Sequence, residues 1–431
     1  MYKTAQHAVL YILFVPLLPF FTIDTRIDTN YTRFRSIKTE KDSKASRLQR
    51  RKEPPIMHVA KTNRGVETFR VYLIGAGVIA RTHADTVRTL FTPGHVTLSV
   101  ADPVPQVLTR FIEQYPEARS FDNAQEMLDE PAQEGDIVIV ATPPWTHCDL
   151  ACMALSTGRH VLCEKPFAIT RAQALQMLRT AKATGRVVGC CSTRQLGTPS
   201  TQEARRLLQE GVLGKVYHVR FIQRYQRARA GIEYQPASTW FLDRSRSGGG
   251  IVIDWGPYDF TVLNHLFQPT RIEFLGAWMA NPITAVQLTP GTVFDVEEHA
   301  GALLRYHLPD ATTVMVSYER AACTQGKAES ILEVEGLDGA VSWDWLAWGQ
   351  ESELTYSYDK DGQLESKTSI LSNEGLVTGS QKPLYYFHQY LLGNPSLAVV
   401  NEQAVFDFSC ICAFYDCVSS GMPQTVSWEG L

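Results

Sequence analysis

The sequence predicts an α/β protein in which an N-terminal, doubly wound parallel sheet is followed by an α+β domain with a large open, mostly antiparallel sheet. Short apolar strands alternate with helical segments over 68–192, which is the pattern of a parallel sheet covered on both faces. The first strand of that series runs into a glycine-rich turn and a helix. Over 193–431, strands follow one another through connections too short for helices, which favours antiparallel pairing.

The elements of the first domain follow from apolar periodicity. The predicted strands cover 69–74, 96–101, 136–141, 160–163 and 186–191. The predicted helices cover 78–90, 105–114, 123–130, 147–157 and 171–184. Because the strands are almost continuously apolar, we expect these helices to bury both faces of the sheet.

The second domain begins with a polar helix over 200–210, a strand over 215–224 and a helix over 250–267. The strands that follow are predicted at 271–279, 300–307, 312–318, 330–335, 340–345 and 354–358. Two helices, 384–392 and 403–420, close the chain. These last helices are candidates for packing back on the first domain.

Residues 1–67 precede the first predicted strand. The segment 8–23 is apolar but includes Pro16 and Pro19, and it is shorter than the roughly 20 residues that a membrane span needs. Residues 24–56 are polar and rich in lysine and arginine, which is typical of disorder. Three interpretations stay open: an extension that does not belong to the working protein, a membrane anchor, or a signal peptide without a recognisable cleavage site.

The composition argues against several classes of function. A formal net charge of −4 provides no basic excess for binding nucleic acid. The nine cysteines lie mostly in apolar runs and lack the paired spacing with histidine that a zinc site requires. We therefore expect no metal site and a cytoplasmic protein with reduced thiols. Membrane contact is expected only if the segment 8–23 is retained.

The segment 71–80 reads V-Y-L-I-G-A-G-V-I-A, a strand that runs into a G-x-G-x-x-A turn and then a helix. Gly75 permits the tight turn, Gly77 lets the backbone approach a pyrophosphate, and Ala80 lets the helix pack on the strand. This is the pattern of a Rossmann dinucleotide-binding domain. The residues predicted to bind the cofactor here are Gly75, Ala76, Gly77, Val78 and Ile79.

Asp102 ends the second predicted strand. An acid at this position typically bonds the adenosine ribose hydroxyls and repels a 2′-phosphate, and no arginine follows it, so NAD is favoured while NADP stays possible. The alternative is that Asp102 caps a helix that begins at Pro103.

Two later segments carry motifs. A-T-P-P-W-T-H occupies 141–147, and G-R-H-V-L-C-E-K-P occupies 158–166. With the glycine loop, G-V-L-G at 211–214 and G-G-G-I-V-I-D-W-G-P-Y at 248–258, they make the chain similar to the glucose–fructose oxidoreductase / inositol dehydrogenase / MocA family. The resemblance covers about residues 68–428, and its most recognisable element is the E-K-P triplet.

The resemblance implies that Lys165 contacts both the substrate and the nicotinamide ribose, and that Pro143 lines the nicotinamide side. Thr142, His147 and Glu164 belong to the same expected cofactor-binding set. By its position alone, Lys165 ends a parallel strand, where ligands bind in open α/β sheets. Partial burial would lower its pKa and let it share a proton with a substrate hydroxyl. The alternative is a surface lysine paired with Glu164.

Asp254 and Tyr258 form the second half of the predicted site. Their i, i+4 spacing puts them on one face of the helix over 250–267, and Pro257 predicts a kink or an irregular start there. The family usually has a proton-transferring histidine where Tyr258 stands, so the chain departs from the pattern. Tyr258 would need its pKa lowered by a neighbour such as Lys165. The alternative is a half-buried aromatic.

Other residues provide weaker signals. Arg194 follows the last strand of the first domain, where the family often carries a residue that reaches the active site; a surface arginine is the alternative. Trp240, Asp243 and Arg244 are candidates for lining a sugar pocket. His299, on a predicted strand, is interpreted as structural.

The resemblance implies an NAD(P)-dependent oxidoreductase that transfers a hydride between nicotinamide and a small-molecule substrate, a sugar, polyol or related hydroxy or carbonyl compound. Lys165 and Tyr258 would move the hydroxyl proton while Asp254 orients the substrate. Two alternatives stay open: a non-catalytic NAD(P)-binding regulator of the same fold, and another cofactor chemistry such as tetrapyrrole reduction or elimination of a sugar substituent. Since open sheets in the family commonly pack together, a homo-oligomer is also expected, with the strand over 312–318 as a candidate face.

Overall fold

The computed structural model describes residues 69–91, 94–226, 238–282, 290–346 and 349–431, all of which belong to one compact unit. The segments 8–23 and 24–56 lie outside these residues, so the three interpretations of that region stay predictions. Within the described ranges, no helix combines the length and the apolar character that crossing a membrane requires.

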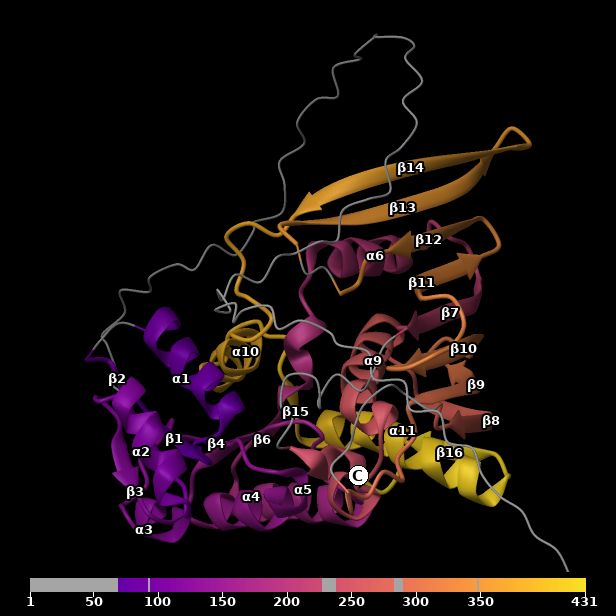
Figure 1. Cartoon of the computed structure of the whole chain (residues 1–431). Coiled ribbons are helices and arrows are strands. Elements are labelled where there is room, and N and C mark those ends of the chain that lie inside the picture. The colour runs from indigo at the N-terminus through magenta and orange to yellow at the C-terminus, as the bar shows by residue number, and fades with distance from the viewer. Residues whose placement is uncertain (1–68, 92–93, 227–237, 283–289, 347–348) are drawn as a thin grey trace, which may run out of the picture. The chain divides into compact units, whose positions relative to one another are not determined.

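Seven strands form the first sheet, in the order β15-β6-β5-β4-β1-β2-β3 (Figure 1). Their bounds are β1 Phe69–Ile74, β2 Val96–Ala101, β3 Arg119–Phe121, β4 Ile137–Val140, β5 His160–Cys163, β6 Val188–Cys190 and β15 Val399–Val400. The strands β1 to β6 pair in parallel, and β4 is buried along its whole length. The predicted doubly wound parallel sheet is therefore confirmed.

Five helices connect the parallel strands: α1 Val78–Leu90, α2 Pro105–Gln114, α3 Ala124–Leu128, α4 His147–Ser156 and α5 Arg171–Thr184. Local chemistry explains where α5 begins and ends. Thr170 and Gln173 form a reciprocal capping box at its start, which satisfies two backbone N–H groups that the helix leaves unpaired. Gly185 follows with a φ of 62°, a left-handed conformation that glycine adopts without strain.

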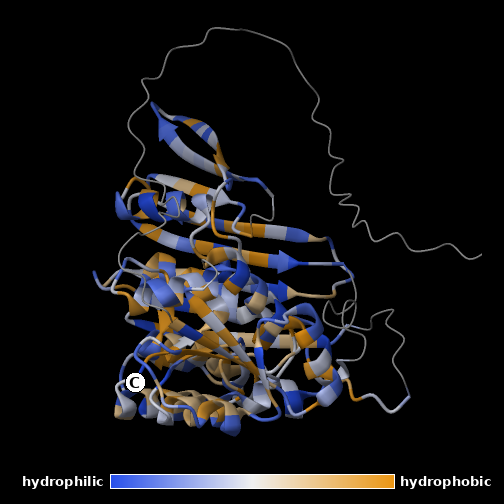
Figure 2. Cartoon of the chain, turned by 90° about the vertical axis from the view of Figure 1, so that its left-hand side faces the viewer, coloured by the Kyte–Doolittle hydropathy of each residue, from blue (hydrophilic) through white to orange (hydrophobic). Residues whose placement is uncertain are grey.

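The second sheet has nine strands in the order β14-β13-β12-β11-β7-β10-β9-β8-β16. Their bounds are β7 Val216–Arg224, β8 Arg271–Ala280, β9 His299–His307, β10 Thr313–Ala321, β11 Glu329–Gly336, β12 Gly339–Trp343, β13 Glu351–Lys360, β14 Gln363–Ser372 and β16 Gln424–Ser427. Only β7 and β10 pair in parallel. Buried and less buried residues alternate over 313–320 of β10, and hydrophobic and hydrophilic bands alternate along strands in Figure 2, as expected for a sheet with one face on the core.

The helices α6 Pro199–Gln209, α9 Ile251–Phe267 and α11 Asn401–Ser420 pack on this sheet. After β14 the chain returns to the first sheet through α10 Lys382–Leu391, which contacts α1. It then adds β15 antiparallel to β6. The sequence did not predict β3, β14, β15 or β16, because β3 and β15 are very short and β14 is largely exposed. The expected homo-oligomer stays a prediction.

The start of α9 differs from the expectation. The helix begins at Ile251 and runs through Pro257, so the irregular start predicted at Pro257 is wrong. The carboxylate of Glu297 accepts hydrogen bonds from the backbone N–H groups of Gly250 and Val252. These bonds satisfy donors that a helix N-terminus otherwise leaves unpaired, and they place the first turn of α9 six residues before the proline.

A fully buried ion pair joins α9 to the second sheet. Asp259 on α9 and Arg320 on β10 are both 0% exposed. The carboxylate of Asp259 accepts from Nε and Nη2 of Arg320 and from the Tyr318 hydroxyl, the last at 2.8 Å. The guanidinium also lies over the ring of Trp255, 5.0 Å from its centroid. Each charge is therefore neutralised where water cannot reach it.

Replacing Asp259 with asparagine should leave the guanidinium of Arg320 buried without a counter-charge. Breaking such a pair costs about 3 kcal/mol, so we expect the melting temperature to fall by roughly 5 °C or more. A thermal melt followed by circular dichroism measures the change. Glu402→Gln is the matched control, because Glu402 pairs with Lys182 on the surface and exposed pairs contribute little. Equal melting temperatures for the two variants would contradict the role given to Asp259.

Candidate active site

A cleft of about 280 Å³ lies where the carboxyl ends of β1, β4 and β5 meet the start of α9. Its walls are formed by 77–79, 141–144 and 164–166 of the first domain, together with Arg194, Trp240, Phe241, Ser247, Gly249, Ile253 and Asp254. Ligands bind at this edge of a doubly wound sheet because the loops after its strands diverge there. The cleft is therefore the candidate active site.

The predicted residues divide into two groups by position. Those that line the cleft are Gly77, Val78, Ile79, Thr142, Pro143, Glu164, Lys165 and Asp254. Gly75, Ala76, Asp102, His147 and Tyr258 do not line it. The second group lies behind the lining residues or beside the glycine turn, and its contacts show what each member does there.

The two glycines of the loop serve different purposes. Gly75 has a φ of 99°, and a Cβ on it would lie 2.7 Å from the carbonyl oxygen of Ala141, so only glycine fits the turn. A Cβ on Gly77 would meet no protein atom within 4 Å. Gly77 is also the N-cap of α1, which has no side-chain cap. An open approach to uncapped N–H groups suits a pyrophosphate.

Asp102 is hydrogen-bonded to the glycine turn. One carboxylate oxygen accepts from the backbone N–H of Ala76 and the other from that of Val104, both at 2.9 Å. Helix α2 begins at Pro105 and its N-cap is Val104, so the alternative in which Asp102 caps a helix beginning at Pro103 is wrong. The carboxylate lies at the end of β2 beside the glycine turn, as predicted from the sequence.

The E-K-P turn is built around a buried carboxylate. Glu164 is 4% exposed and pairs with His83 of α1 at 2.8 Å and with Arg194 at 2.7 Å. Its second oxygen accepts from the backbone N–H of Lys165 at 3.1 Å. Burial by itself would raise the pKa of Glu164, but Arg194 and the hydrogen bond from His83 hold this pKa well below its usual range.

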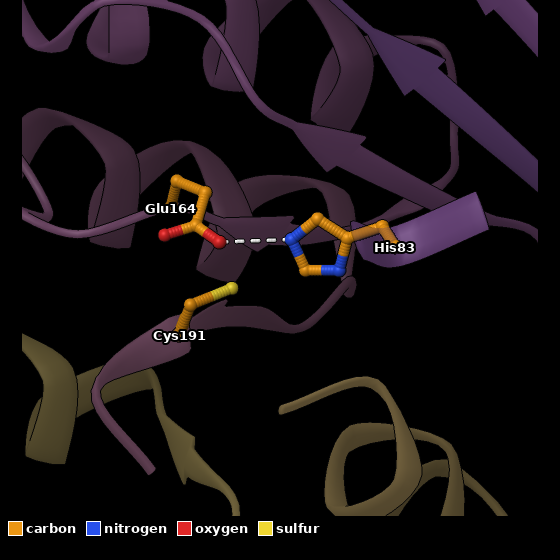
Figure 3. Close-up of side chains that lie close together, drawn as sticks. All are labelled: His83, Glu164 and Cys191. Atoms are coloured by element: carbon orange, nitrogen blue, oxygen red, sulfur yellow. Dashed lines mark hydrogen bonds and ion pairs between the residues drawn. The ribbon is translucent and has the colours of Figure 1, made fainter. Parts of the chain in front are cut away.

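Figure 3 shows His83 reaching from α1 to Glu164, with Cys191 beside them. Potential ligand atoms of these three residues lie within 4.8 Å of one another. The charge of Glu164 is already balanced by Arg194, and burial raises the pKa of the Cys191 thiol well above its usual value. We interpret Glu164, His83 and Arg194 as a hydrogen-bonded network with the Cys191 thiol beside it.

Lys165 pairs with Asp254. Its ammonium nitrogen lies 2.6 Å from a carboxylate oxygen of Asp254 and 3.1 Å from the carbonyl oxygen of the same residue. Burial would lower the pKa of Lys165, but the charge of Asp254 outweighs this and raises the pKa above its usual value. The expected lowering of this pKa is therefore wrong, and so is the alternative pairing with Glu164.

Tyr258 lies beneath the lysine. Its side chain is buried, and the ammonium of Lys165 lies 5.4 Å from the centroid of its ring. Burial raises the pKa of Tyr258 even though Arg194 and Lys165 act to lower it. The structure therefore lacks the lowered pKa that proton transfer by Tyr258 would need, because the loss of hydration exceeds the effect of both cations.

His147 links the two loops that line the cleft. Its ring nitrogens lie 2.8 Å from the carbonyl oxygens of Thr142 and Pro166, and the residue is fully buried. Burial lowers the pKa of His147, although both carbonyl groups favour the protonated form. The structure thus places this residue behind the expected cofactor-binding loop rather than in the cleft.

The residues with weaker sequence signals also divide into some that line the cleft and some that do not. Arg194 and Trp240 line the cleft, whereas Asp243 caps the short helix α8 (Arg244–Ser247). Arg244 pairs with Glu297, and the structural His299 bonds to Glu319 at 2.7 Å.

Sequence reasoning missed two features of the cleft. One is His83, whose place on the buried face of α1, one turn after Ala80, was a usable signal. The other is the set of rings around the predicted Trp240, which stacks on Phe241 and meets Trp145 edge to face. These rings come together only in the folded chain.

Family models match both parts of the chain. Residues 69–191 match a model described as "Oxidoreductase family, NAD-binding Rossmann fold". Residues 201–351 match the "GFO/IDH/MocA C-terminal domain". The two matches together cover more than half of the chain.

The sequence identity to two individual relatives is 34% and 23%. The chain is 34% identical to D-glucoside 3-dehydrogenase of Escherichia coli (strain K12) over 189 residues, 44% of this chain and 51% of that one. It is 23% identical to levoglucosan dehydrogenase of Pseudarthrobacter phenanthrenivorans over 301 residues, 65% of this chain and 74% of that one. In three of the curated relatives the match spans 58%, 51% and 59% of their length.

A solved structure agrees in fold. Levoglucosan dehydrogenase in complex with NADH and levoglucosan superposes with a TM-score of 0.66 at 18% identity, covering 84% of this chain and 100% of that one. Such a likeness shows the shared arrangement of a parallel sheet followed by an open, mostly antiparallel sheet. The chain therefore belongs to the glucose–fructose oxidoreductase / inositol dehydrogenase / MocA (GFO/IDH/MocA) oxidoreductase family.

Proposed function

We propose that the chain is an NAD-dependent dehydrogenase that transfers a hydride between nicotinamide and the CH–OH carbon of an uncharged sugar or polyol. The observation that carries the proposal is the Lys165–Asp254 pair, which holds an ammonium group in the same cleft as the glycine turn. A nucleotide-binding turn and a fixed proton donor in one cleft are what such a reaction requires.

The first domain accounts for the cofactor. Its pyrophosphate would lie over Gly77 at the N-terminus of α1, and Thr142 and Pro143 would line the nicotinamide side. The carboxylate of Asp102 favours NAD, because it would repel the 2′-phosphate of NADP. When bound, nicotinamide supplies or accepts the hydride, and the protein positions it.

The proposed role of Lys165 is to stabilise negative charge on the substrate oxygen. Because its pKa is raised, the side chain is an ammonium at neutral pH. It can donate a hydrogen bond to the substrate oxygen and stabilise the negative charge that develops there. In the direction of carbonyl reduction, the same group donates the proton. The ring of Tyr258 lies beside Lys165, and the raised pKa of Tyr258 keeps its hydroxyl protonated, so this group does not act as the base at neutral pH.

The charge balance of the cleft supports an uncharged substrate. Lys165 is neutralised by Asp254 and Arg194 by Glu164, so neither cation is left to pair with an anionic group. The stacked rings of Trp240 and Phe241 provide an apolar wall of the kind that sugar rings pack on. The names of the relatives, which include a D-glucoside dehydrogenase and a levoglucosan dehydrogenase, point to the same class.

Lys165→Ala should lower kcat by roughly 100-fold or more, because it removes the group that stabilises charge on the substrate oxygen. Tyr258→Phe should lower kcat by less than about tenfold, since the ring stays and only a poorly acidic hydroxyl is lost. Nicotinamide absorbance during turnover of D-glucosides and anhydrosugars provides the rates. Lys182→Ala, on the surface, is the control. A larger loss for Tyr258→Phe than for Lys165→Ala would assign proton transfer to the tyrosine.

Asp254→Asn should change how the rate of carbonyl reduction depends on pH. In the wild type the raised pKa of Lys165 keeps the ammonium charged, so we expect a flat rate between about pH 6 and 9. The variant loses the charge that raises this pKa while burial still lowers it. The rate should therefore begin to fall at a lower pH than in the wild type. If the rates of the variant and the wild type began to fall at the same alkaline pH, Asp254 would not control the protonation of Lys165.

Gly77→Ala tests the cofactor position. The added methyl meets no protein atom but occupies the space given to the pyrophosphate, so we expect NAD affinity to fall roughly tenfold or more without a change in melting temperature. Gly75→Ala, by contrast, should lower the melting temperature, because its Cβ would meet a backbone carbonyl. Calorimetric titration with NAD measures the affinities. If Gly77→Ala bound NAD as tightly as the wild type, the pyrophosphate would not lie over Gly77. Tight NAD binding by the wild type without turnover of any sugar would favour a non-catalytic regulator.

A further inference from the structure

A second cavity lies at the opposite end of α9 from the active-site cleft. It measures about 500 Å³, compared with 280 Å³ for the cleft, and shares no lining residue with it. The last turns of α9, the helices α6 and α11, the segment 396–398 and the first residue of β15 contribute to its lining. This volume is within the range of small-molecule sites.

One side chain that lines the cavity is a cation outside the ion pairs of the described residues. Arg205 of α6 lines it, and within the described ranges its guanidinium makes no ion pair. One of its nitrogens lies 3.0 Å from Nε2 of His265, and its Nε is buried without a hydrogen-bond partner. The next residue, Arg206, instead pairs with Glu203 and Glu210 on the surface.

The neighbours of Arg205 do not neutralise it. Burial and the charge of Arg205 lower the pKa of His265 to about 4, so the imidazole is uncharged at neutral pH. The carboxylate of Asp407 also lines the cavity, but it already accepts hydrogen bonds from Thr261, Asn264 and Gln403. A partly buried guanidinium with open donors is a recognised binding group for carboxylates and phosphates.

The rest of the lining is suited to hydroxyl groups. Gln268, Thr270, Ser396 and Gln403 contribute polar side chains. Asn264 is only 3% exposed, and its side-chain amide oxygen has no hydrogen-bond partner in the described residues. A buried acceptor of this kind is stabilised by a donor from a ligand or water. We propose that the cavity is a second binding site, for a small polyhydroxylated anion whose carboxylate or phosphate pairs with Arg205.

Calorimetric titration of the full chain, with saturating NADH present to occupy the cofactor part of the cleft, tests this. Gluconate supplies a carboxylate and glucose 6-phosphate a phosphate, so the stronger binder identifies the anion. Glucose is the uncharged probe and should bind at least about tenfold more weakly than that anion, because it lacks the charged hydrogen bond. The absence of saturable heat for both anions up to about 10 mM would overturn the proposal.

Arg205→Gln should weaken anion binding about tenfold or more, whereas Arg205→Lys should retain part of it and the matched surface variant Arg206→Gln should bind like the wild type. Equal affinity in Arg205→Gln and the wild type would overturn the proposal. A crystal structure of the wild type with the bound anion provides a test that is independent of whether the variants fold. An anion beside Arg205 supports the site, and ordered water alone in the cavity overturns it.

Discussion

Carboxylates taken out of water need a partner charge or several hydrogen bonds, and this requirement organises the region between the two sheets. Glu164, after β5, is paired with Arg194. Asp254, on the first turn of α9, is paired with Lys165. Asp259, one turn further, is paired with an arginine of β10. Each pair joins segments that are far apart in the chain, so the charges hold the E-K-P turn, α9 and the second sheet in one arrangement.

Helix α9 is the element on which these contacts converge. It is apolar on nearly all sides and almost fully buried, as a helix surrounded by other elements must be. Its first turn presents Asp254 to the cleft, and its middle is bonded to β10 through Asp259. Its last turns line the second cavity. Thr261 donates to Asp407 and also lies 2.9 Å from the Ser192 hydroxyl, so hydrogen bonds connect this part of α9 to α11 and to the segment after β6.

The same pairing determines the chemistry available in the cleft. A lysine that is buried alone tends to lose its proton, whereas one held against a carboxylate keeps it. Lys165 is in the second situation, which suits a group that stabilises negative charge on oxygen rather than one that removes a proton. Because Arg194 is neutralised too, both cations of the cleft have a counter-charge, which is the basis of the proposal for uncharged substrates. The second cavity differs in this respect, since Arg205 forms no ion pair with any residue that the structure describes.

The sequence by itself determined what depends on local chemistry. The bounds of β1, α1 and α5 agree with the prediction, because apolar period, glycine turns and capping residues act within a few positions of one another. The G-x-G-x-x-A turn and the E-K-P triplet were sufficient to identify the cleft and the family. Only the tertiary structure decided the partners and protonation of the site. Lys165 and Asp254 are 89 positions apart, and both the Coulomb interaction and the loss of hydration depend on distances in space that the order of residues does not contain.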